Sequence, residues 1–258
     1  MLKKVCSGIA LFALVLGISV FAAQAQTSEI KEKTPMYSYI ANWALPRAQW
    51  AEMAKVDAAD STIMEKAMAD GTLVAYGNDE NLIHTVEGET NDGWWSSNSM
   101  AGILKVLDQL YESGSATNPV LSTATKHWDE VLETRYYNWK SGSYKGAYTH
   151  VGAYKLKADA PDDAVDTLSK NLVAPLFEKL LADGTIVEYE IDTAAIHTTT
   201  PGYFMIVYVT PNADGLDKVD AAVEAAIKAD PLGGQAFGSM EDFSAHRDEL
   251  LRTNATFK

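Results

Sequence analysis

The five histidines of the sequence are its most versatile reactive side chains, and four of them occur as two matched pairs. His84 and His197 are each the central residue of an Ile-His-Thr motif, and the two motifs are 113 residues apart. His127 and His246 each begin a His-x-Asp-Glu motif. Imidazole titrates near neutral pH, so a histidine can act as a general base or as a metal ligand. The pairing indicates that matched histidines occupy equivalent places in a duplicated fold.

His84 and His197 are the candidate catalytic residues. In a duplicated barrel, such two-fold-related side chains can approach each other across the interior. Each has an acid five residues earlier, Asp79 and Asp192. On a regular strand this odd spacing places acid and histidine on opposite faces, so no Asp–His metal site is predicted. The alternative is a histidine whose ring nitrogens satisfy backbone groups at a turn.

Two further sets of polar residues have competing interpretations. His127 and His246 stand where elements begin, which favours a capping or salt-bridge role. Glu188 and Glu190 lie two residues apart, on one face of a predicted strand. Buried together, they would form an acid–base pair with one raised pKa. A solvated strand face is the favoured interpretation, because charged residues are seldom buried without a partner.

The aromatic residues are distributed unevenly. All six tryptophans lie within the first 139 residues. The segment Trp94-Trp95-Ser96-Ser97-Asn98 is an unusual sequence for a buried strand. Core packing explains most aromatic clusters. The alternative is a pocket in one half of the protein for a small apolar or planar molecule. The predicted ligand-binding residues are Trp94, Trp95, Ser97, Asn98 and, on the opening strand of the second half, His150.

No sequence motif assigns a reaction. The chain contains no GxSxG, P-loop, HExxH, CxxC or Rossmann glycine pattern. Its one cysteine, Cys6, lies in the N-terminal segment. A mature chain without it has no thiol chemistry and no zinc–thiolate site. The sequence leaves open whether the protein is an enzyme.

The N-terminus is typical of an exported protein. Two lysines precede an apolar run over 9–22, and an Ala-Gln-Ala motif follows, so residues 1–25 are a predicted signal peptide and 26–35 a linker. The expected location is the periplasm or the exterior. Cleavage lowers the basic residues from 21 to 19 against 35 acids, which moves the net charge from −14 to −16. Such a chain is expected to bind neither nucleic acid nor, after cleavage, a membrane.

An internal duplication organises the rest of the chain. Residues 65–85 and 178–198 align without a gap, and twelve of the 21 positions are identical. Each half predicts the order β-α-β-β-α-β, which is the ferredoxin-like unit. The repeats span 36–140 and 146–258. The first has strands at 36–44, 72–75, 93–97 and 131–139, helices within 47–69 and at 100–111, and a long loop over 77–92. The second has strands at 147–156, 185–191, 203–210 and 249–257, and helices at 162–182 and 216–227.

The repeated units carry a resemblance to a known superfamily. A helix, an Asp-Gly turn and a strand recur at 69–75 and 182–188, and a His-x-Asp-Glu-x-Leu segment precedes each last strand. In these features the chain resembles the dimeric α/β-barrel superfamily in its tandem fused form. The resemblance implies an α+β fold in which two ferredoxin-like repeats form one barrel with pseudo-two-fold symmetry. It also implies that one chain completes the barrel, as a monomer or a weak homodimer.

The superfamily implies several functions, because it includes cofactor-free monooxygenases, isomerases, haem proteins and proteins of no known activity. The leading expectation is an exported protein that binds a small molecule inside the barrel, without a cofactor. The alternative is a cofactor-independent oxygenase or isomerase that uses a barrel histidine as general base. Haem binding and a purely structural barrel with a filled interior are weaker alternatives.

Overall fold

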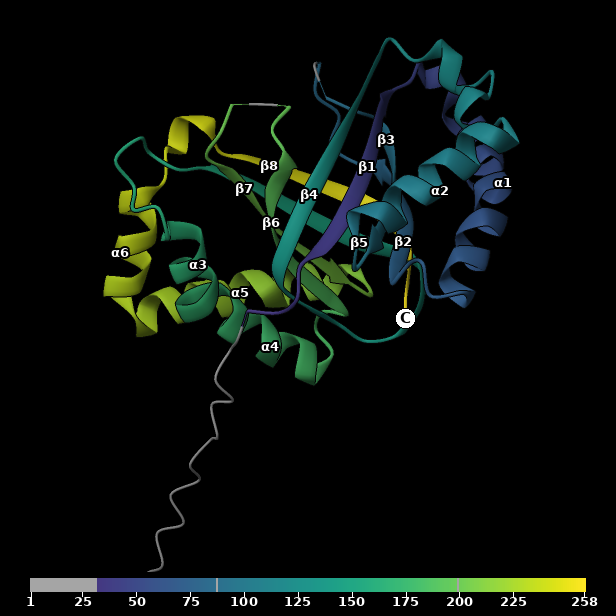
Figure 1. Cartoon of the computed structure of the whole chain (residues 1–258). Helices are drawn as coiled ribbons and strands as arrows, with labels where there is room; N and C mark the ends of the chain where they lie inside the picture. The colour runs from purple at the N-terminus through teal and green to yellow at the C-terminus, as the bar shows by residue number, and fades with distance from the viewer. Residues whose placement is uncertain (1–31, 87, 199) are drawn as a thin grey trace, which may run out of the picture.

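Eight strands form one closed antiparallel barrel in the computed structural model, which describes residues 32–86, 88–198 and 200–258 (Figure 1). The predicted signal peptide lies outside these ranges. Around the barrel the order is β1-β3-β2-β8-β5-β7-β6-β4. The strands are β1 (Met36–Ala44), β2 (Ala75–Asn81), β3 (Asn91–Ser97), β4 (Lys126–Trp139), β5 (Gly142–Lys155), β6 (Glu188–Ile196), β7 (Tyr203–Thr210) and β8 (Arg247–Phe257).

Each half of the chain contributes one four-stranded ferredoxin-like sheet. The first half has the order β4-β1-β3-β2, and the second half repeats it as β8-β5-β7-β6. Pairing of β2 with β8 and of β4 with β6 joins the two sheets and closes the barrel. The predicted fold class is confirmed.

The helices lie outside the barrel, and each set covers the sheet of its own half (Figure 1). The first half has α1 (Trp50–Ala69) and α2 (Met100–Ser113). The second has α3 (Ala164–Leu168), α4 (Ala174–Asp183), α5 (Ala213–Ala229) and α6 (Pro231–Met240). Within the described ranges, none of the helices has the length and apolar character that spanning a membrane requires.

Equivalent residues begin the equivalent helices of the two halves. The side chain of Ser99 accepts a hydrogen bond from the backbone N–H of Gly102 at the start of α2. Asn212 does the same with Gly215 at the start of α5. Such caps satisfy backbone donors that the first helical turn leaves free. The duplicated sequence therefore specifies the helix starts as well as the strands.

The barrel interior is unusually acidic. Alternation along the strands turns seven carboxylates inward: Asp79, Asp92, Glu130, Glu188, Glu190, Asp192 and Glu249. Glu188 is 4% exposed, so the solvated strand face favoured for it from the sequence is wrong. Burial raises the pKa of Asp192 to about 7 and the pKa of Glu249 to about 8. The interior therefore holds carboxyl groups that are easier to bury in their neutral form.

Several predicted element boundaries shift in the structure. The single helix predicted at 162–182 is divided into α3, a π-helical segment at Ser169–Val173, and α4. The long loop predicted over 77–92 is shorter, because β2 continues to Asn81 to pair with β8. Helix α6 was not predicted, since it contains the adjacent glycines 233 and 234, which disfavour helix.

Candidate functional site

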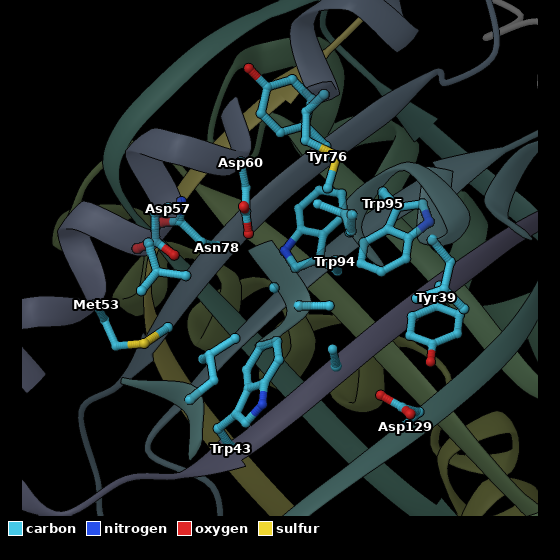
Figure 2. A pocket seen from close by; sticks show the side chains of 18 of the residues that line it. Tyr39, Trp43, Met53, Asp57, Asp60, Tyr76, Asn78, Trp94, Trp95 and Asp129 are labelled. Carbon is cyan, nitrogen blue, oxygen red and sulfur yellow. The ribbon is translucent and has the colours of Figure 1, made fainter. Parts of the chain in front are cut away.

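A cavity of about 320 Å³, here called the first-half cavity, lies between the outer face of the β1–β4 sheet and helices α1 and α2 (Figure 2). The ligand site was expected inside the barrel, whereas this cavity lies in the helix–sheet layer outside it. Its volume is at the lower end of the range for small-molecule pockets.

A row of small side chains forms the floor of the cavity. Ala41 on β1 pairs with Gly93 on β3, and Gly93 pairs with Asn78 on β2. A Cβ atom built on Gly93 would have only the Trp43 ring within 4 Å, at 3.8 Å. The space above Gly93 is therefore open.

Aromatic rings stand on both sides of this floor. Tyr39 and Trp95, which are paired on neighbouring strands, stack with ring centroids 4.6 Å apart. The Trp95 indole is fixed further by its Nε1–H, which donates to the Ile103 carbonyl at 3.0 Å. On the other side, Trp43 stacks on the His127 ring with centroids 5.1 Å apart. The walls are therefore flat, apolar and held in place.

Helix α1 contributes both apolar and acidic residues to the roof. Met53, Val56 and Met64 belong to its buried stripe. Asp57 and Asp60 lie in the same stripe and line the cavity. The Asp60 carboxylate accepts a hydrogen bond from Ser115. Figure 2 shows Asp57 and Asp60 side by side on the same helix.

Partial burial makes both acids of α1 hard to ionise. Burial raises the pKa of Asp57 to about 7, and the nearby carboxylates Asp60 and Asp79 add to this rise by repulsion. Burial also raises the pKa of Asp60 to about 6. Carboxyl groups with such pKa values exchange protons near neutral pH, as general bases in enzymes do.

The third acid of the lining, Asp129, belongs to a polar edge of the cavity on β4. His127 Nδ1 lies 2.8 Å from the Asn42 carbonyl oxygen, and His127 Nε2 lies 3.5 Å from Asp129 Oδ1. Burial of Tyr39 and its hydrogen bond to Asp129 raise the Tyr39 pKa. His127 and Asp129 are both partly exposed, so solvent reaches this edge.

Two of the five predicted ligand-binding residues line the cavity. Trp95 stands in its aromatic wall, and Trp94 lines it beside Gly93. The two tryptophans belong to opposite faces of β3, because neighbours on a strand alternate. Trp94 accordingly packs toward Phe257 and donates from Nε1 to Asp79 at 3.1 Å.

The other three predicted ligand contacts lie elsewhere. Ser97 donates to the Thr72 carbonyl at 2.6 Å and sits beneath Gly102 at the start of α2. Asn98 is exposed. His150 lies on the outer face of the second-half sheet, where its ring stacks on Tyr208. None of these three residues lines the first-half cavity.

The matched histidines do not meet across the barrel. His84 is exposed and stacks on Trp50 with ring centroids 4.4 Å apart. His197 is exposed as well. Neither residue lines the first-half cavity. No general base of the kind expected at these positions therefore faces the barrel interior.

Sequence reasoning missed Asp57 and Asp60, although the sequence contains a signal for them. The apolar residues Met53, Val56 and Met64 define a helical stripe that turns toward the sheet. Asp57 and Asp60 fall within that stripe, where a polar residue breaks the pattern of a buried face. Positions that break the local sequence pattern in this way tend to be functional sites.

The cavity does not suit haem, the cofactor that the resemblance offered as an alternative. Haem carries anionic propionates, and neither lysine nor arginine lines the cavity, whereas three aspartates do. The lining has one histidine, His127, whose ring already contacts Asn42 and Asp129. Within the described part of the chain, no three histidine, cysteine or acidic side chains are grouped to hold a metal ion.

Comparison with known proteins supports the fold. A candidate monooxygenase from Lactobacillus acidophilus NCFM matches with a TM-score of 0.63 at 12% identity, over 87% of this chain and 97% of the other. A candidate monooxygenase from Fusobacterium nucleatum subsp. nucleatum matches with a TM-score of 0.59 at 8% identity, over 88% and 95%. No family model and no curated protein match the sequence. At these identities the structural likeness shows the fold and leaves the reaction open.

Proposed function

We propose that the protein binds a small, partly apolar molecule in the first-half cavity. The observation that carries the proposal is the row of Ala41, Gly93 and Asn78, which leaves open space beneath the helices between flanking aromatic walls. An apolar cavity with a few polar groups at its edge is the usual form of a ligand site. The two structurally similar proteins are named as candidate monooxygenases, which is consistent with a small-molecule site on this fold.

Filling the cavity tests this proposal. Gly93→Ile places a branched side chain on the floor, where the backbone and the nearest ring leave room for a Cβ atom. The neutral fluorescent probe N-phenylnaphthylamine, titrated at pH 5, is expected to bind the wild type and to lose at least tenfold in affinity on Gly93→Ile. The matched control is Ser143→Ile, on an exposed strand position away from the cavity. Equal binding to wild type and Gly93→Ile would reject the cavity as the ligand site.

The raised pKa of Asp57, to about 7, favours a second candidate function, in which the cavity catalyses cofactor-independent proton abstraction. This retains the oxygenase or isomerase alternative but assigns the base to Asp57 instead of a histidine. Nitrobenzisoxazole is a planar probe for it: the base takes the ring C–H proton, the N–O bond breaks, and the ring opens to a single product, a cyanonitrophenolate. The rate should rise with pH through about 7 and disappear in Asp57→Asn. A rate that Asp57→Asn leaves unchanged would contradict this function.

We also propose that the mature protein works in the periplasm or outside the cell. The N-terminal lysines, the apolar run and the Ala-Gln-Ala motif support this. The full chain, expressed in a bacterial host and fractionated, should yield a periplasmic protein whose intact mass begins at Gln26. A full-length chain retained in the cytoplasm would contradict export.

A further inference from the structure

The first-half cavity carries negative charge that no cationic side chain in its lining neutralises. Its carboxylates are Asp57, Asp60 and Asp129, and neither lysine nor arginine lines it. Asp129 has a neighbour in His127, at 3.5 Å. Within the part of the chain that the structure describes, the Asp57 carboxylate has no hydrogen bond or ion pair. The unbalanced charge is therefore concentrated on α1.

Burying carboxylates without a cation is unfavourable, and the cavity acids respond accordingly. Burial is the main cause that raises the pKa values of Asp57 and Asp60. The two residues are one helical turn apart, so their side chains project on the same side of α1. A cation placed between them would provide the missing partner and favour the ionised form of both.

The wall opposite these acids is aromatic. In the view of Figure 2, Asp57 and Asp60 lie on one side of the cavity and the stacked Tyr39–Trp95 pair lies on the other. Trp43 closes the same space near the sheet. The faces of aromatic rings carry partial negative charge and attract cations, most strongly when water is excluded. Carboxylates facing aromatic rings are thus complementary to a cation that has an apolar body.

We propose that the occupant of the first-half cavity is an organic cation: an amine or a quaternary ammonium group on a small apolar or planar body. The charged group lies beside Asp57 and Asp60, and the body lies against Trp43 and the Tyr39–Trp95 pair. This inference rests on the proposed function, because it names the ligand class of the same cavity. The net charge of −14 also attracts cations toward the protein from a distance.

Three probes of nearly the same shape separate charge from shape. Phenyltrimethylammonium is the cation, tert-butylbenzene replaces its nitrogen with carbon, and benzenesulfonate is an anion of similar size. Quenching of tryptophan fluorescence at pH 8 gives the three affinities for the mature protein. The cation should bind roughly tenfold more tightly than tert-butylbenzene, because one ion pair and one cation–π contact distinguish them. Benzenesulfonate should bind weakest.

Two double variants test whether the carboxylates of α1 cause the preference for the cation. Asp57→Asn/Asp60→Asn keeps the shape of the cavity and removes both charges, so the preference for the cation should disappear. Because both acids ionise with difficulty, the amides should not disturb folding, which circular dichroism checks. The control is Asp108→Asn/Glu112→Gln, which removes two exposed charges from neighbouring α2. The control should retain the preference.

The preference should also depend on pH. It should be strong at pH 8 and absent at pH 5, since the acids take up protons as the pH falls through their raised pKa values of about 7 and about 6. The titratable groups around Asp57 are Asp60 on the same helix, Asp79 and Tyr76 on β2, Tyr111 on α2, Tyr39 on β1, and His127 and Asp129 on β4. In the double variant the change between pH 5 and pH 8 should vanish.

The outcomes distinguish this inference from the function on which it rests. Equal affinity for phenyltrimethylammonium and tert-butylbenzene at pH 8, with both lost in Gly93→Ile, would overturn the cation preference and keep the cavity. A preference that survives in Asp57→Asn/Asp60→Asn would overturn the role of these acids. Binding of all probes unchanged by Gly93→Ile would overturn both the inference and the proposed function.

Discussion

The two halves of the barrel share a strand order and helix starts, and differ in the space between sheet and helices. In the first half the central row across the sheet is Ala41, Gly93 and Asn78. The register places Gly152, Ile206 and Ile191 in the equivalent row of the second half. Ile206 and Ile191 are buried in the second-half core beneath its helices. A cavity thus exists where large side chains are missing from one copy of a duplicated scaffold.

The polar edge beside each central row, where His127 and His246 lie, differs much less between the halves. His127 Nδ1 lies 2.8 Å from the Asn42 carbonyl oxygen, and His246 Nδ1 lies 3.1 Å from that of Ala153. Each histidine also stacks on an aromatic ring of the neighbouring strand. The histidine of the His-x-Asp-Glu motif therefore links two neighbouring strands in both halves, whether or not a cavity lies beside it. The salt-bridge or capping role predicted for this pair agrees with that placement.

The largest expected effect on stability comes from creating a cavity in the second-half core. Ile206→Ala removes three carbon atoms from a packed core, so we expect it to lower the free energy of unfolding by about 2–5 kcal/mol. Gly93→Ala, at the equivalent position, adds one carbon to open space and should change stability by less than about 1 kcal/mol. Urea denaturation followed by circular dichroism measures both. Equal losses in the two variants would mean that the halves are packed alike.

The next largest effect concerns the acids that the halves share inside the barrel. Asp79 and Asp192 are equivalent, and burial raises the pKa of Asp79 to about 6 and of Asp192 to about 7. A carboxyl group with a raised folded-state pKa gives its full contribution to stability below about pH 4, where both folded and unfolded states are protonated. That contribution is lost as the pH rises through the folded pKa. The protein should therefore be less stable at pH 8 than at pH 5.

Asp192→Asn should remove part of this pH dependence. Asp192 is 1% exposed and accepts a hydrogen bond from Thr134, which an amide oxygen can still accept. The variant should be more stable than wild type at pH 8, by on the order of 2 kcal/mol, and equal to it at pH 4. Urea midpoints at the two pH values give the comparison. A variant that loses stability at pH 8 would show that ionised Asp192 is well solvated.

The sequence predicts the shared features of the halves better than their differences. Alternation and the Asp-Gly turns predict most of the strands, because strands depend on local periodicity. The barrel was expected from the internal duplication and from the resemblance to a known superfamily. The cavity depends on which residues meet across strands, such as Gly93 beside Asn78, and register is set by pairing that local patterns do not contain. Trp95 could be selected from the unusual composition of its sequence segment alone. The sequence marks Asp57 as a break in the apolar stripe of α1, but only the packing of α1 against the sheet places it beside a cavity.

The smallest expected effect on stability concerns Asp129 and Asp248, the acids beside the histidines at the polar edges, where the halves are most alike. Asp248 lies 3.4 Å from His150 Nε2 and 3.2 Å from His246 Nε2, whereas Asp129 pairs with one histidine of the described chain, His127, at 3.5 Å. These pairs are partly exposed, so each should contribute less than about 1 kcal/mol. Asp248→Asn should still lower the urea midpoint more than Asp129→Asn does, since Asp248 contacts two histidines. If the two variants lose the same stability, the second histidine adds nothing, and the halves differ only in how their central rows are filled.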